Sequence, residues 1–229
     1  MLGNTRQRVT GFVLPVGNGA VGKTSVAQVL NHLRPGVTNY EEILARITKT
    51  KNLEFEFVTV NINIDGLEYA VVIQLLVPPG QKATEGDPTG RSFEDVIDIY
   101  RFHFRLVDVV LLTYDITIRE SFNELDYWIN AVHELCYEST QVVVLGTHLD
   151  KSEAREVSPE EASMAVEYVK RRFTEHDALW RGSVTSIEVS NLEGHNMEAL
   201  KTLLAKNILR SRGQLPAGSE EWDEGSEVV

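Results

Sequence analysis

Short runs of apolar and β-branched residues alternate along this chain with longer stretches in which apolar residues recur with helical spacing. Side chains alternate between the two faces of a strand but return to one face of a helix after about 3.6 residues, so these patterns predict strands and helices in turn. Such alternation is typical of an α/β fold with a mainly parallel sheet. The predicted strands cover residues 9–16, 55–64, 67–77, 108–115, 141–146 and 183–190.

The second and third predicted strands are joined by Asp65 and Gly66. Asp-Gly favours the tight two-residue turn of a β-hairpin, so this pair of strands should be antiparallel. The sequence therefore predicts a six-strand sheet that is mostly parallel with one antiparallel strand, and helices on both of its faces.

Two helix starts are also predicted. Thr117 precedes Glu120 by three residues, and Ser158 is followed by Pro159 and then by Glu161. Both have the spacing of a capping box, in which a hydroxyl and a carboxylate satisfy the first N–H groups of a helix. We expect a helix to begin directly after each hydroxyl residue.

The composition favours one acidic globular domain. The chain has 34 acidic and 22 basic side chains and a net charge of −12, which argues against nucleic acid or an acidic membrane as the main partner. The 229 residues suit a single core, which we expect within residues 1–212. Residues 213–229 are rich in Gly, Ser and acidic residues and have no base, so they predict a disordered tail.

The remaining bulk features predict a cytoplasmic protein without an anchor. Cys136 is the only cysteine, so no internal disulfide is expected and a reducing compartment is favoured. Leu2 stands where N-myristoylation needs glycine, and the C-terminal residues contain no cysteine for prenylation. No signal peptide or membrane-spanning run is expected.

A glycine-rich loop carries the clearest chemical motif. Residues 17–24 (GNGAVGKT) match G-x-x-x-x-G-K-[ST], between a predicted strand and a predicted helix. Glycines allow the backbone N–H groups to surround phosphates. Lys23 is expected to contact the outer phosphates and Thr24 to bind Mg²⁺. The sequence therefore predicts a nucleotide site.

The base should bind where later strands end. Asp150 follows the strand at 141–146, and its carboxylate can accept from the ring N–H and the exocyclic amine of guanine. This favours guanine over adenine. The alternative is an ordinary strand-end aspartate in a turn.

Together these motifs resemble those of the Ras/Rab-like small GTPases, in order and spacing, over most of the chain. The matching segments are GNGAVGKTS (17–25), YDITIRESFNELDYWI (114–129), THLD (147–150) and EVSNLEGHNM (188–197). The resemblance implies a three-layer P-loop NTPase fold, GTP and GDP as ligands, Mg²⁺ as cofactor and a protein effector.

The resemblance also assigns residues to roles. The implied phosphate-binding residues are Gly17, Asn18, Gly19, Ala20, Val21, Gly22, Lys23, Thr24 and Gly80. The implied guanine-binding residues are Thr147, His148, Asp150, Ser190, Asn191 and Leu192. Gln81 would orient the attacking water, and Lys23 would act with it in catalysis. Thr50 or Thr48 would join Thr24 at the metal, with Thr38 a third alternative.

Two positions depart from the family pattern. His148 replaces a lysine, which predicts weaker nucleotide binding, unless it is simply a loop histidine. In LLVPPGQK (75–82), Val77 falls where the D-x-x-G motif has an aspartate. A literal D-x-x-G at Asp87 to Gly90 is a less favoured substitute, because it starts ten residues beyond Val77 and a metal-binding carboxylate should lie at the strand end. VPPGQ is similar to the TVPGQ of MglA-type bacterial GTPases, which lack this acid and act as switches.

The sequence thus predicts a GTPase switch with slow hydrolysis, stimulated by a partner that the MglA resemblance suggests is a roadblock-domain dimer. Two alternatives stay open: a non-hydrolysing scaffold that binds GTP or GDP, and a P-loop kinase. The kinase would need an arginine-rich lid, whereas Arg171 and Arg172 lie on a predicted outer helix.

Overall fold

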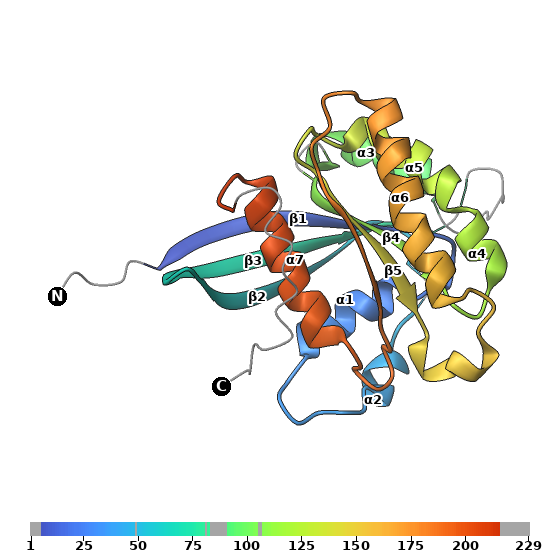
Figure 1. The fold of residues 1–229 in the computed structure, drawn as a ribbon. Coiled ribbons are helices and arrows are strands. Elements are labelled where there is room, and N and C mark those ends of the chain that lie inside the picture. Colours follow the sequence, from blue (N-terminus) through green and yellow to red (C-terminus); the bar gives the residue numbers. More distant parts are fainter. Residues whose placement is uncertain (1–5, 49, 81, 83–90, 105–106, 216–229) are drawn as a thin grey trace.

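The computed structural model describes residues 6–48, 50–80, 82, 91–104 and 107–215. Six strands form one sheet in the order β2-β3-β1-β4-β5-β6, as Figure 1 shows. The strands are β1 (Gln7–Val16), β2 (Glu54–Ile64), β3 (Leu67–Val77), β4 (Val107–Asp115), β5 (Gln141–Thr147) and β6 (Val184–Glu188). Only β2 and β3 pair antiparallel among these strands; the other neighbours are parallel. The predicted α/β fold with a mixed six-strand sheet is confirmed.

The β2–β3 hairpin forms where Asp-Gly predicted it. Ile64 pairs with Leu67, and the two turn residues between them have φ angles of 52° at Asp65 and 80° at Gly66. Two consecutive positive φ angles are those of a type I′ turn, whose twist matches that of paired strands. The Asn63 side chain accepts the Gly66 N–H at 3.1 Å and completes the turn.

Helices cover both faces of the sheet. The helices are α1 (Lys23–His32), α2 (Glu41–Leu44), α3 (Phe93–Phe104), α4 (Arg119–Asn123), α5 (Leu125–Val132), α6 (Pro159–His176) and α7 (Met197–Ser211), with 3-10 turns η2 (His133–Leu135) and η3 (Leu149–Ala154). None of them, within the described part of the chain, has the length and apolar character needed to cross a bilayer.

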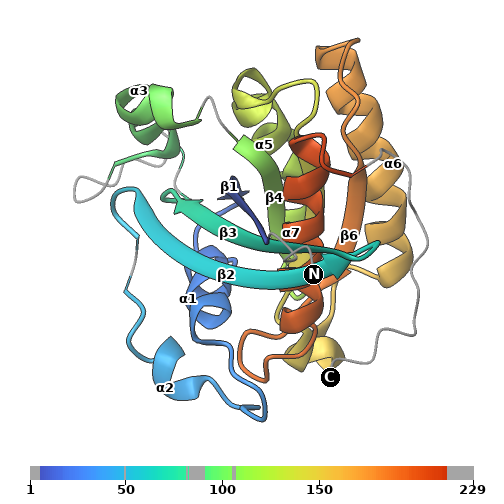
Figure 2. The same ribbon diagram turned by 90° about the vertical axis from the view of Figure 1, so that its left-hand side faces the viewer.

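The core has two halves because adjacent strand residues point to opposite faces. Val13 packs with residues of α1 and α7, whereas Leu14 packs with residues of α3, α5 and α6. Figure 2 shows α1 and α3 on opposite sides of the β2–β3 hairpin. Strands β4 and β5 are buried along their whole length, as expected for central parallel strands.

One of the two predicted capping boxes is confirmed. Ser158 accepts the Glu161 N–H at 3.2 Å, and the Glu161 carboxylate accepts the Ser158 N–H at 2.9 Å. The capping box at Thr117 is wrong, because α4 starts at Arg119 with no side-chain cap. The Thr117 hydroxyl instead donates to Asp115 Oδ1 at 2.7 Å, since a carboxylate two residues earlier is a closer acceptor.

The sixth strand is shorter than predicted. β6 ends at Glu188, and the chain then turns so that the Ser190 N–H donates to the His195 carbonyl at 3.1 Å. Residues 189 and 190, predicted as strand, therefore begin a loop at the edge of the candidate site.

Asp108 joins the first strand to the end of the last helix. Its buried carboxylate accepts from the Phe12 N–H at 2.8 Å, from Ser211 Oγ at 3.1 Å and from Arg212 Nη2 at 2.9 Å. Burial raises the pKa of Asp108, and the hydrogen bonds from Phe12 and Arg212 oppose that rise.

We expect Asp108→Ala to lower the free energy of unfolding by about 2–3 kcal/mol, because it leaves buried donors without an acceptor. Urea unfolding followed by circular dichroism measures this loss. Asp98→Ala, an exposed aspartate of α3, is the matched control and should change stability by less than about 0.5 kcal/mol. Equal losses in the two variants would contradict the role given to Asp108.

Candidate functional site

Four loops meet at the carboxyl edge of the sheet. They follow β1 (residues 17–22), β3 (78–80), β5 (148–150) and β6 (189–192), and these four strands run in the same direction. Loops that follow parallel strands lie at one edge of the sheet, which is where α/β folds bind ligands. The direction of these strands therefore places the four loops of the candidate site at one edge of the sheet.

The loop at residues 17–22 has a backbone that favours glycine. Gly17 has a φ of 145°, and a Cβ there would lie 2.1 Å from the Thr113 carbonyl oxygen. Gly22 has a φ of 93° and directly precedes α1. The first turn of α1 contains no acidic residue, so its free N–H groups and positive dipole end remain available to an anion.

Lys23 is buried within this loop. Its Nζ donates to the carbonyl oxygens of Gly17 and Asn18, both at 2.7 Å, and only 6% of the residue is exposed. Burial lowers the pKa of Lys23 to about 7, because few groups replace the water that stabilises its charge. No carboxylate pairs with this amine among the described residues. An anion such as a phosphate would stabilise the charged form.

A tryptophan that sequence reasoning missed fixes the same loop. Trp128 of α5 is fully buried, and its Nε1 donates to Asn18 Oδ1 at 2.7 Å. Buried indole N–H groups need such a partner, and this requirement was the available signal. The contact holds the loop at residues 17–22, the predicted phosphate loop, against the helix layer on one face of the sheet.

Glycine at position 80 allows the end of β3 to approach the loop. A Cβ at Gly80 would lie 2.2 Å from Lys23 Nζ and 2.6 Å from the Asn18 carbonyl oxygen. The predicted catalytic residue Gln81 and the Asp87–Gly90 motif lie outside the described residues. Lys82, beyond Gln81, forms an ion pair with Glu124 at 2.5 Å.

Two threonine hydroxyls meet at the start of α1. Thr24 Oγ1 and Thr50 Oγ1 are 2.6 Å apart, and Thr50 is buried. Thr48, the alternative, is exposed, and no hydrogen bond joins it to Thr24 within the described part of the chain. Hard cations such as Mg²⁺ prefer oxygen ligands, so two adjacent hydroxyls beside a phosphate loop suit that ion. No group of three or more His, Cys, Asp or Glu residues suited to a metal occurs in the described part of the chain.

Thr147 joins the loop after β5 to the phosphate loop. Its fully buried hydroxyl lies 2.7 Å from the Val21 carbonyl oxygen and 3.0 Å from that of Tyr114. The hydroxyl therefore fixes the spacing between the two loops, and its single hydrogen is used inside the protein.

The Asp150 carboxylate is hydrogen-bonded to a residue in the loop after β6. Ser190 Oγ donates to Asp150 Oδ1 at 2.7 Å and accepts the Glu193 N–H at 3.0 Å. A carboxylate held through one oxygen keeps acceptor capacity on the other. This geometry suits a ligand edge with two adjacent N–H donors.

The His148 ring contacts the ends of β4 and β5. Its backbone is left-handed, with a φ of 62°, and its Nδ1 lies 2.9 Å from Asp115 Oδ2 and 3.1 Å from Thr147 Oγ1. Asp115 is itself held by Thr117. The ring is therefore fixed by the end of β4.

Asn191 and Leu192 belong to the loop after β6 and form the last part of the candidate site. Asn191 is buried, its Oδ1 has no hydrogen-bond partner among the residues that the structure describes, and a Cβ at Gly22 would lie 3.0 Å from its Nδ2. The Leu192 carbonyl accepts the N–H of Tyr40 at 3.0 Å. Tyr40, which sequence reasoning missed, is buried against Gly194. The connection from α1 to β2 thus folds back onto the loop after β6.

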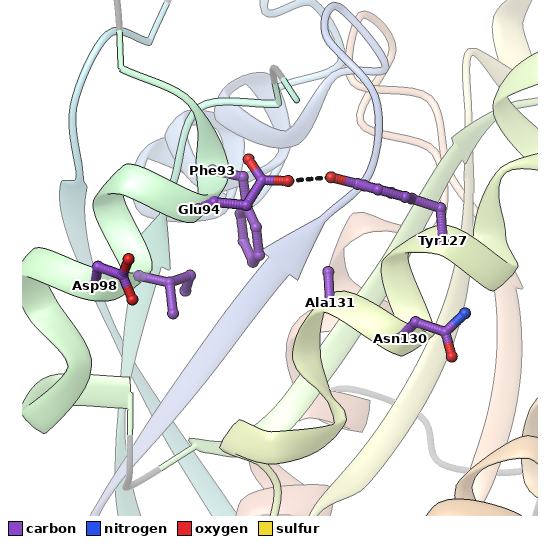
Figure 3. A pocket seen from close by; sticks show the side chains of 7 residues that line it. Phe93, Glu94, Asp98, Tyr127, Asn130 and Ala131 are labelled. Atoms are coloured by element: carbon purple, nitrogen blue, oxygen red, sulfur yellow. Dashed lines mark hydrogen bonds between the residues drawn. The ribbon is translucent and has the colours of Figure 1, made fainter. Parts of the chain in front are cut away.

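A separate cavity of about 350 Å³ lies between α3 and α5, shown in Figure 3. The Tyr127 hydroxyl donates to Glu94 across it. The lining residues are Phe93, Glu94, Ile97, Asp98, Tyr127, Asn130 and Ala131. None of the predicted site residues lines this cavity, so it is distinct from the candidate site.

Comparison with known proteins gives one family and several relatives. The Ras family model matches residues 89–194. Ras-related protein Rab-19 of Homo sapiens is 25% identical over 198 residues, which cover 86% of this chain and 74% of that protein. Ras-related protein Rab-30 of Homo sapiens is 28% identical over 159 residues, which cover 62% of this chain and 72% of that protein.

A further relative is much longer than this chain. Ras-related protein Rab-44 of Mus musculus is 27% identical over 209 residues, which cover 91% of this chain but only 18% of that protein. The family match begins at residue 89, and the relatives extend the similarity to as much as 91% of the chain. Together with the six-strand fold, these similarities support a relationship to the Ras and Rab small GTPases.

Proposed function

We propose that this chain is a guanine-nucleotide-dependent switch that binds GTP and GDP with Mg²⁺ and slowly hydrolyses GTP to GDP and phosphate. The observation that carries the proposal is the buried amine of Lys23, whose partners within the described part of the chain are backbone carbonyls of a loop suited to phosphates. The similarity to Ras and Rab proteins supports the same ligand class.

Guanine follows from the acceptor at Asp150. Its Oδ1 is occupied by Ser190, and the remaining acceptor capacity suits the ring N–H and the exocyclic amine of guanine. Adenine has no ring N–H donor on that edge. The backbone N–H of Asn191 supplies a donor for the guanine carbonyl oxygen, in a loop bounded by Ser190 and Leu192.

Thr24 and Thr50 are the proposed metal ligands from the protein. Bound Mg²⁺ would neutralise charge on the phosphates. Lys23 stabilises the charge that develops during phosphoryl transfer, and Gln81 orients the attacking water. Hydrolysis is slow without help because positioning sets the rate of this reaction, so a stimulating partner is proposed, of the roadblock type that the MglA resemblance suggests.

The switch segments are residues 37–51 and 78–91. Thr50 and Gly80 lie in these segments and next to the phosphate loop. A bound γ-phosphate would therefore favour one conformation of both segments. An effector protein would bind the GTP-ordered state. We propose a cytoplasmic location.

A non-hydrolysing scaffold is the second candidate, favoured by Val77. This residue is fully buried and apolar at the end of β3, where the related GTPases have an acid. The kinase alternative has less support, because Arg171 and Arg172 lie on α6 and are paired there with Glu175 and, for Arg172, with Asp126 of α5.

Purified without added nucleotide, the chain should contain bound guanine nucleotide. With Mg²⁺ it should release phosphate from GTP slowly, and Gln81→Leu should reduce this release at least about tenfold. Lys23→Ala should weaken GDP binding about 100-fold, whereas the exposed Lys170→Ala should not. Wild-type binding by Lys23→Ala would refute the site, and bound nucleotide without release under any condition would favour the scaffold.

Thr50→Val should raise the Mg²⁺ concentration that half-maximally slows release of a fluorescent GDP analogue, by about tenfold, because it removes one oxygen near Thr24. Thr48→Val provides the matched control and should keep the wild-type midpoint. A shift in the Thr48 variant alone would transfer the metal role to that residue.

Nucleotide binding should take up a proton above about pH 7. The pKa of Lys23 is lowered to about 7 in the free protein, and a bound phosphate raises it. The lysine is therefore neutral before binding and charged after it, so affinity falls as pH rises from about 7, by up to about tenfold per unit.

Isothermal titration at pH 8 in two buffers of different ionisation enthalpy measures this uptake. Lys23→Arg, whose side chain stays charged, is the control and should show no uptake. Equal proton uptake by the two proteins would contradict the assignment to Lys23.

A further inference from the structure

Val77 lacks the acid, but a carboxylate lies on the paired strand directly opposite. In the β2–β3 register, Glu54 pairs with Val77. Side chains of directly paired residues in an antiparallel sheet lie on the same face, with Cβ atoms about 5 Å apart. A carboxylate on residue 54 therefore occupies the same edge and the same face as one on residue 77.

That face is the one that packs against α1. Val77 belongs to the core half that contains Val26 and Leu30 of α1. Two residues along β2, Glu56 accepts from Gln28 Nε2 at 2.5 Å and from Asn31 Nδ2 at 2.7 Å. Because residues 54 and 56 of a strand point the same way, Glu54 faces α1 nearer to its first turn.

Glu54 also contacts Thr50, one of the two hydroxyl residues at the start of α1. Burial raises the pKa of Glu54, and a hydrogen bond from the Thr50 side chain opposes that rise. Thr50 Oγ1 is in turn 2.6 Å from Thr24 Oγ1. A carboxylate and two hydroxyls thus gather at the start of α1, and no ion pair engages Glu54 within the described part of the chain.

We propose that Glu54 supplies the carboxylate for the Mg²⁺ site that position 77 lacks. This inference rests on the proposed function, because the cation would be held together with the nucleotide phosphates. Carboxylate and hydroxyl oxygens are the donors that Mg²⁺ uses beside phosphates, and they fit that ion. In this assignment the acidic residue lies on β2 instead of β3, at the same edge of the sheet.

The test measures cation dependence in the full chain. Release of a fluorescent GDP analogue is followed over a range of Mg²⁺ concentrations, and Mn²⁺ binding to the GDP complex is measured by electron paramagnetic resonance. Glu54→Gln keeps the size of the side chain and removes its charge. It should raise the Mg²⁺ midpoint and weaken Mn²⁺ binding about tenfold.

Two further variants make the assignment specific. Glu56→Gln alters the next residue on the same face and should keep the wild-type midpoint, because its partners are Gln28 and Asn31. Glu54→Gln combined with Val77→Asp returns an acid to the opposite position and should restore the midpoint. Rescue by the double variant excludes a general loss of folding.

The outcomes separate this inference from the proposed function. Guanine nucleotide binding with the same Mg²⁺ midpoint in wild type and Glu54→Gln would overturn the role of Glu54 alone. Equal shifts in Glu54→Gln and Glu56→Gln would also overturn it, because any charge on this face would then suffice. Failure of the wild-type chain to bind any guanine nucleotide would overturn the proposed function, and this assignment with it.

Discussion

The buried amine of Lys23 is the constraint on which the site depends. A cation removed from water needs compensation, and among the described residues only the carbonyl oxygens of Gly17 and Asn18 provide it. Those carbonyls can point inward only because the loop adopts conformations that glycine allows. Trp128 holds Asn18 from the helix layer, and Gly80 leaves room for the amine. The loop is thus built around a charge that the protein itself leaves incompletely satisfied, which is the property of a site for anions.

The other loops are positioned by hydrogen bonds between strand ends. Thr147 spans from β5 to Val21 of the phosphate loop, and Ser190 spans from the end of β6 to Asp150. Each bond connects segments far apart in the sequence and is buried or partly buried, where a lost partner is costly. Distances between the predicted phosphate loop and the residues proposed to bind the base are therefore set by the sheet, as precise ligand recognition requires.

The sheet was predictable from local patterns, whereas the contacts between elements were not. Val, Ile and Leu runs predict the strands, and Asp65-Gly66 predicts the tight turn of the hairpin between β2 and β3. Ser158 and Glu161 form their capping box although Arg119 also donates to the Glu161 carboxylate, whereas the Thr117 hydroxyl donates to Asp115 two residues earlier. The roles assigned to Lys23, Thr24 and Asp150 rest on motifs and remain predictions. The bond from Trp128 to Asn18 and the packing of Tyr40 on Gly194 depend on tertiary approach, which no local spacing encodes.

The apparent loss at Val77 illustrates the same limit. A motif specifies the residue at one position of one strand. The interaction of a cation with a carboxylate depends instead on the distance between them in space. Because paired strands place residues 54 and 77 on one face, either can carry the acid without changing the fold. With the acid at residue 54, a buried apolar residue at 77 leaves the negative charge at the proposed cation site unchanged. It also adds packing against the core half that contains α1. Absence of a motif residue is therefore weak grounds for inferring lost chemistry until the opposite position of the strand pair is known.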